Sequence, residues 1–381
     1  MTESTWTDEL LDSMRRTGDP DADAAIEQTY AEGRAEHVRK ALVDFDRNTD
    51  RIPDDLPSRL REYFEKTAVL PDWADPDRME RGNDLLGRYQ PYLLSTLLCS
   101  SLPMCYGCGD GAQVLYRSQR LTGRVYHRLI DTSQFLVDVL CEGGLQPGGH
   151  GVRTAQKIRL LHATMRYHAS RDSDWDPAWG HPVNQEDLAG TLTSFSVVVP
   201  VGLQRLGVDL PDGDRDDFVH IWRVIGHILG IDQRLNPADF DAAQALMDRI
   251  LDRQQSPSEA GRALTKALLD FIRETMPGSE FASLGPTLIR HLAGDHQSDL
   301  VDVPQPDWAG LATAAGLEAG AGFSAVTSRT TNAVPLTNQL AAKLGDAVLK
   351  SGIRLANKGQ RSEWQVPTGL TDTSEEAAAS R

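Results

Sequence analysis

No stretch of this 381-residue sequence holds 18 or more consecutive apolar residues, which excludes a typical transmembrane helix. The first 20 or so residues contain no apolar run of the signal-peptide kind, so a cytoplasmic location is the expectation. Four cysteines are too few for a disulfide scaffold, and reduced thiols are expected. The net charge of −16 indicates an acidic surface, which argues against duplex nucleic acid and against anionic lipid as partners.

Alternation of strands and helices is absent too, and almost every periodic segment has helical spacing. The sequence therefore predicts an all-α protein. Helices are expected over about 22–47, 55–69, 83–103, 152–169, 214–229, 237–253, 257–275, 284–293 and 335–356, with one long helix or two across 112–141, softly broken near Thr122–Gly123. Asn184 is the predicted N-cap of a further helix with Asp187 at its third position. The β-branched run Phe195–Val201 fits a strand, but Pro200 favours an irregular helix.

Four parts of the chain are distinguished by this pattern. We expect an N-terminal helical extension, a core that is densest in apolar helices, a C-terminal helical segment packing on that core, and a tail of polar composition that is disordered. Their expected bounds are 1–80, 81–300, 301–370 and 371–381.

The stretch "CYGCGDGA" contains two familiar patterns. Cys105 and Cys108 form a C-x-x-C pair, but covalent haem attachment would need histidine where Gly109 stands, and a zinc site would need a second ligand pair. Buried free thiols are the favoured interpretation. Gly107, Gly109 and Ala112 fit the G-x-G-x-x-A pattern of dinucleotide sites, which requires a preceding strand. Because a helix is expected there, a tight turn between two helices is favoured.

His220 and His227 lie seven residues apart in "FVHIWRVIGHIL", close to two helical turns, and so share one helix face. They could form a metal-ligand pair. Two hydrogen-bonded histidines in a packed helix are the commoner explanation and the favoured one.

Arg128 and Thr132 in "RLIDT" are separated by one helical turn and have apolar flanks. An arginine in apolar surroundings must find an anion or a polar ligand, because an unpaired buried charge is costly. By itself, this pattern favours a structural salt bridge to a neighbouring helix over a ligand site.

In "KIRLLHATMRYH", His162 is surrounded by apolar residues, with Arg159 and Arg166 on its own side of the helix. A neutral imidazole can ligate haem iron, and nearby guanidinium groups can pair with propionate carboxylates. Periodicity alone favours a structural core histidine. His168 points well away from His162.

Taken together, five segments resemble, in the same order, those of the superfamily of rubber oxygenases (latex clearing proteins) and MpaB oxygenases. They span roughly residues 85–235. The segments are "SLPMCYGCGDGAQVL", "RLIDT", "KIRLLHATMR", "NQEDLAGTLTSFS" and "HIWRVIGHILGI".

This resemblance implies an all-α fold with a globin-like core around a non-covalent haem b. It implies that His162 is the proximal iron ligand and that Arg128 and Thr132 are distal catalytic residues; Arg159 and Arg166 are the candidate propionate partners. It also implies an oxygenase that uses O2 to oxidise or cleave a carbon–carbon double bond of an isoprenoid. Without a secretion signal, a small apolar unsaturated substrate is expected rather than a polymer particle.

The chain departs from rubber oxygenases at two points. Asp131 stands where they have a lysine directly before the distal threonine, so no lysine ligand is expected there. Their proposed glutamate base has no clear counterpart, with Asp110 and Glu142 as the nearest guesses. A haem peroxidase, peroxygenase or hydroxylase, a non-catalytic haem sensor or carrier, and a helical scaffold without haem remain alternatives. Nothing in the sequence fixes the oligomeric state.

Overall fold

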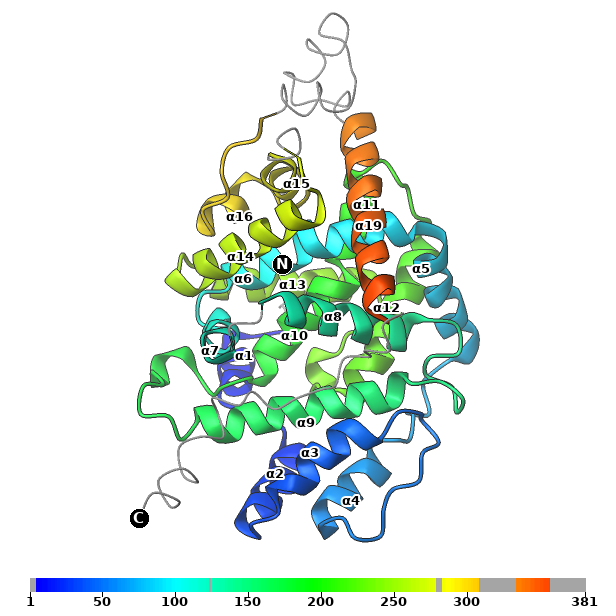
Figure 1. The fold of residues 1–381 in the computed structure, drawn as a ribbon, viewed down its shortest axis with the longest axis vertical. Coiled ribbons are helices and arrows are strands. Elements are labelled where there is room, and N and C mark those ends of the chain that lie inside the picture. Colours follow the sequence, from blue (N-terminus) through cyan, green and yellow to red (C-terminus); the bar gives the residue numbers. More distant parts are fainter. Residues whose placement is uncertain (1–4, 123–124, 279–282, 308–333, 357–381) are drawn as a thin grey trace, which may run out of the picture.

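A computed structural model of the chain describes residues 5–122, 125–278, 283–307 and 334–356 (Figure 1). Within these residues the secondary structure is helical and includes no β-strand, only an isolated bridge between Cys108 and Gln255. The predicted all-α class is confirmed. In this described part of the chain, no helix has the length and apolar character needed to cross a membrane.

The helices fall close to the predicted ranges. In chain order they are α1 (Asp8–Arg15), α2 (Pro20–Ala31), α3 (Ala35–Asp44), α4 (Ser58–Lys66), α5 (Pro76–Thr96), η1 (Leu97–Ser101), α6 (Leu102–Gly107), α7 (Ala112–Thr122), α8 (Val125–Leu140), α9 (Gly151–Ala169), η2 (Pro177–Trp179), α10 (Gln185–Ser196), α11 (Val198–Arg205), α12 (Asp212–Ile228), η3 (Gln233–Leu235), α13 (Phe240–Gln254), α14 (Glu259–Thr275), α15 (Leu284–Ala293), α16 (Asp295–Leu300) and α19 (Val334–Ala356).

Local capping and turn chemistry account for several of these ends. The Asn184 side chain accepts the backbone N–H of Asp187 at 2.9 Å and donates to its carboxylate at 2.7 Å, which confirms the predicted start of α10. Pro200 lies inside α11, so the helical interpretation of Phe195–Val201 is confirmed. The single helix predicted over 22–47 was wrong: Gly33, with φ +67°, separates α2 from α3, because glycine adopts the left-handed conformation without steric cost.

The helix predicted over 83–103 is three consecutive elements. In α5 the backbone leaves helical geometry at Tyr89, just before Pro91, because a proline ring clashes with the carbonyl group one turn earlier. Leu97–Ser101 then form a fully buried π-helical turn before α6 begins. Such turns often occur at functional sites, and this one contributes to the cavity described below.

Figure 1 shows α9 with α2, α3 and α4 on one side and α8, α10 and α12 on the other. The small N-terminal helices pack their own apolar cluster onto Leu160 and Ala163 of α9. The largest cluster lies on the opposite side and includes Trp222 and Phe135. At the far end of the chain, α19 lies along α5. The predicted tail, 371–381, and most of 301–370 lie outside the described residues.

Candidate functional site

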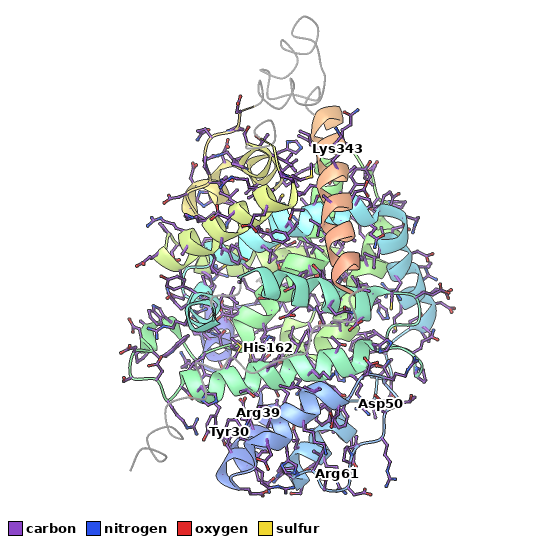
Figure 2. The ribbon with its side chains drawn as sticks, in the orientation of Figure 1. Tyr30, Arg39, Asp50, Arg61, His162 and Lys343 are labelled. Atoms are coloured by element: carbon purple, nitrogen blue, oxygen red, sulfur yellow. The ribbon has the colours of Figure 1, made fainter. Side chains whose placement is uncertain are left out.

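The predicted site residues lie on two helices that pack against each other, α8 and α9. Thr132 is in α8. His162 is in the middle of α9 (Figure 2). Arg128 is also in α8, one turn before Thr132, but the side chains of residues 118–130 lie outside those that the structure describes. The helices therefore bring together the segments that the sequence singled out.

His162 lies on the inner face of α9. Ile158 and Met165, one turn before and after it, pack against the central apolar cluster. Leu160 and Ala163 occupy the opposite face and meet the N-terminal helices. His162 is half-buried. The imidazole is thus placed among apolar side chains on the side of α9 that packs against α8 and α12.

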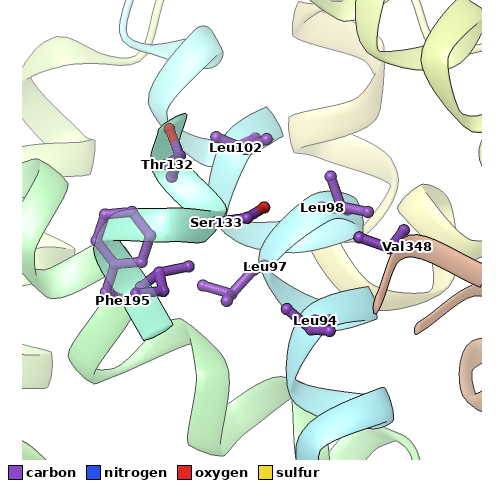
Figure 3. A pocket seen from close by; sticks show the side chains of 9 residues that line it. Leu94, Leu97, Leu98, Leu102, Thr132, Ser133, Phe195 and Val348 are labelled. Carbon is purple, nitrogen blue, oxygen red and sulfur yellow. The ribbon is translucent and has the colours of Figure 1, made fainter. Parts of the chain in front are cut away.

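Thr132 borders a cavity between α8, the α5–η1 segment, α10 and α19 (Figure 3). Hydrocarbon side chains form most of its wall. Among the described residues that line it, only Thr132 and its neighbour Ser133 have polar side chains. The described residues that line it are Leu94, Leu97, Leu98, Leu102, Thr132, Ser133, Leu136, Phe195 and Val348.

An aromatic stack supports one wall of this cavity. Phe195 of α10 stacks on Trp222 of α12 with ring centroids 5.0 Å apart and planes 11° from parallel. Phe135 and Phe218 also contact the Trp222 ring, which is 1% exposed. Sequence reasoning did not single out Phe195 or Trp222, because their role depends on helices that meet only in the folded chain.

Arg159 and Arg166 make ion pairs with carboxylates of the N-terminal segment. Arg159 donates from Nε and Nη2 to both oxygens of Asp19, at 2.6 and 2.8 Å. Arg166 donates from Nε to Asp23 at 2.7 Å and from Nη1 to the Val183 carbonyl at 3.0 Å. Both arginines are buried. A role at haem propionates would require these pairs to be shared or broken, and it stays a prediction.

Close packing explains why glycine stands at two positions of "CYGCGDGA". A Cβ atom at Gly107 would overlap with the Gln297 side chain, and one at Gly109 would meet the Ser256 hydroxyl. The turn joins α6 to α7, as predicted, so the preceding strand that a dinucleotide site requires is not there. All four cysteines of the chain lie in its described part, and none is in a disulfide bond.

His220 and His227 share one face of α12, as predicted, and both contact Trp73 edge to face. His220 Nε2 accepts the backbone N–H of Asp75 at 3.0 Å. Burial lowers the pKa of both imidazoles, which favours the neutral form. Their contacts are those of structural histidines. Within the described residues, no cluster of three or more His, Cys, Asp or Glu side chains could hold a metal ion.

The acidic residues considered as a base lie in different surroundings. Asp110 follows α6 and forms an ion pair with Arg15, at 3.6 Å between Oδ2 and Nη2. Its side chain is 42% exposed. Glu142 is exposed beyond the end of α8. Asp131, at the position of the rubber oxygenase lysine, is half-buried beside Thr132.

An all-α protein with an apolar cavity beside the α8–α9 pair is the class that these observations define. Residues 97–324 match the family described as ER-bound oxygenase mpaB/B'/Rubber oxygenase, catalytic domain. Because this match covers more than half of the chain, the protein belongs to that family and is an oxygenase by class.

Two further comparisons agree with the family. The chain is 27% identical over 296 residues to a rubber oxygenase from Streptomyces sp. (strain K30), covering 74% of this chain and 70% of the relative. Its structure is similar to that of latex clearing protein LCP in the closed state, with a TM-score of 0.74 and 24% sequence identity. That likeness covers 88% of this chain and 91% of the other, and it shows a shared fold.

Proposed function

We propose that this chain is a haem b-dependent oxygenase that uses O2 to oxidise or cleave a carbon–carbon double bond of a small, apolar, isoprenoid-like molecule. One observation carries the proposal: adjacent helices place His162 on an inner apolar face of α9 and Thr132 beside the apolar cavity of α8. Membership of the oxygenase family supports the reaction class.

The residues present fit a haem. A non-covalent haem needs one axial donor from the protein and an apolar enclosure, not a cluster of ligands. His162, half-buried between Ile158 and Met165, provides an imidazole in such surroundings. When bound, the haem would supply the iron that binds and activates O2.

Each of the chain's own groups has a distinct role in this proposal. His162 would hold the iron of the haem through one ring nitrogen. Arg128 and Thr132 would provide hydrogen-bond donors, and fixed donors favour negative charge that develops during a reaction. The hydrocarbon side chains beside Thr132 exclude water, which strengthens these electrostatic interactions. With Asp131 in place of lysine, the chain provides no amine ligand at that position.

The substrate class is inferred from the site and from one relative. The relative is a rubber oxygenase, so its name refers to an unsaturated hydrocarbon. The wall near Thr132 has the same character, since leucine, phenylalanine and valine provide seven of the nine lining residues that the structure describes. A charged or strongly polar molecule that approached Thr132 would lose its hydration without gaining partners.

Reconstitution of the purified chain with haemin tests the cofactor. We expect a Soret band in the wild type and its loss, or a large weakening, in His162→Ala. His168→Ala is the matched control, because His168 lies on the same helix and is also half-buried. Far-ultraviolet circular dichroism checks that both variants are folded. An intact Soret band in folded His162→Ala would disprove the ligand assignment.

Turnover distinguishes the reaction from its alternatives. We expect oxidised products from a short isoprenoid olefin in the presence of O2, with activity strongly reduced in Arg128→Gln and Thr132→Val. Turnover driven by peroxide without O2 would instead indicate a peroxidase or peroxygenase. Reversible binding of O2 or CO with no product from any olefin would indicate a sensor or carrier.

A further inference from the structure

The apolar cavity beside Thr132 is too small for the proposed substrate. Its free space is enough for about one molecule of the size of water or dioxygen, whereas even a five-carbon isoprene unit is several times larger. We propose that this cavity is a binding site for dioxygen, from which the gas reaches the distal side of the haem. This inference rests on the proposed function for its role, but not for the binding itself.

The polarity of the wall favours an apolar gas over water. A buried water typically makes about three hydrogen bonds, and cavities lined by leucine, isoleucine and phenylalanine stay dry and bind apolar guests such as xenon. Among the lining residues that the structure describes, the hydroxyl groups of Thr132 and Ser133 are the only side-chain polar groups. Dioxygen has no hydrogen bonds to lose and is more soluble in hydrocarbon than in water. Of the two reactants, dioxygen is therefore the one that the apolar cavity should bind.

The position of the cavity links it to the reaction. Thr132, proposed to act on the distal side, is itself part of the wall (Figure 3). Leu136, one turn further along α8, continues the same wall and is 4% exposed. A molecule held between these residues lies against the helix that carries both proposed distal residues.

The opposite wall comes from outside the matched catalytic domain. Val348 belongs to α19, beyond residues 97–324, and is 8% exposed. Two hydrogen bonds join α19 to α5. Ser95 Oγ donates to the Ala341 carbonyl, and Tyr92 Oη donates to Asn338 Oδ1 at 3.0 Å. A wall held in this way resists collapse, so the small space persists.

Xenon-pressurised crystals of the full chain test binding directly, with or without haem. We expect a xenon peak between Leu98, Leu136 and Val348. Val348→Phe fills the space and removes the peak, whereas Val348→Ala enlarges it and raises the xenon occupancy. Val69→Phe is the control, since Val69 is 67% exposed and is not among the described residues that line the cavity. If Val348→Phe does not fold, Val348→Ala still tests the site.

Oxygen kinetics test the role. In the haem-loaded enzyme, Val348→Phe should raise the KM for O2 several-fold, with a smaller change in kcat at saturating O2, and Val69→Phe should change neither. No xenon peak at this place, or a peak that both Val348 variants leave unchanged, would overturn the site. An unchanged KM for O2 would overturn its role in supply. Absence of any oxygenase turnover, with xenon bound as expected, would overturn the proposed function and leave the gas site standing.

Discussion

The Arg159 guanidinium donates two hydrogen bonds to the Asp19 carboxylate, although 140 residues separate them in the sequence. Asp19 is 2% exposed and Arg159 is 7% exposed. A third donor nitrogen of Arg159 reaches the Ile228 carbonyl at 3.2 Å. One side chain of α9 thereby fixes the start of α2 and the end of α12, which sets the orientation of the helix that carries His162.

Loss of the Asp19 charge should therefore destabilise the fold strongly. Asp19→Asn leaves the buried guanidinium without its hydrogen-bonded counter-ion, and only the more exposed Asp21 carboxylate, 3.8 Å away, remains, so the cost is up to about 3–5 kcal/mol. Asparagine is as good an N-cap as aspartate, so capping of α2 is preserved and the loss is due to the ion pair. The free energy of unfolding in urea measures it. The control is Asp54→Asn, whose pair with Arg51 is largely exposed, with an expected cost below about 1 kcal/mol. Equal costs would contradict a stabilising role for the buried pair.

The contact between α5 and α19 should tolerate no side chain at Gly345. A Cβ atom there would overlap with the Pro91 carbonyl oxygen, so Gly345→Ala must push the helices apart. We expect a loss of about 1–3 kcal/mol in unfolding free energy and faster proteolytic removal of the C-terminal helix. Gly87→Ala is the control within α5: no atom lies within 4 Å of its Cβ position, so the alanine should stabilise the helix by up to about 1 kcal/mol. A neutral Gly345→Ala would contradict the close packing.

Lys157 should make stability depend on pH in the alkaline range. Burial lowers the pKa of this amine to about 8 in the folded chain, against 10.5 for an ordinary lysine, and the carboxylate of Asp138 opposes the shift. Below pH 8 the lysine is charged in both states, so the cost of burying its charge is fully present. Between pH 8 and 10.5 the unfolded chain binds more protons, and stability rises with pH.

Lys157→Met removes that cost. We expect it to stabilise the fold by about 1–3 kcal/mol at pH 7, with the gain disappearing as the pH approaches 10.5. Urea unfolding of both proteins across this range measures the difference. Lys40→Met, at an exposed lysine, should show no such pH-dependent difference. A gain that is constant from pH 7 to 10.5 would mean that packing, and not charge, is responsible.

Short-range sequence signals predicted most of the helices, and the reasons are local. The start of α10 depends on Asn184 and Asp187, three residues apart. The π-helical turn Leu97–Ser101 was not predicted. Its apolar residues suit an α-helix equally well, and the choice depends on what packs around them.

The sequence by itself determined the helical class, the family and the placement of His162 and Thr132 on neighbouring segments, because periodicity and ordered motifs are properties of the chain. Only the tertiary structure decided which partners those segments meet. It paired Arg159 with Asp19 and Arg166 with Asp23, and it brought Val348 to the cavity beside Thr132. Such contacts join residues far apart in the sequence, and the burial of the whole core fixes them, not any pattern within one segment.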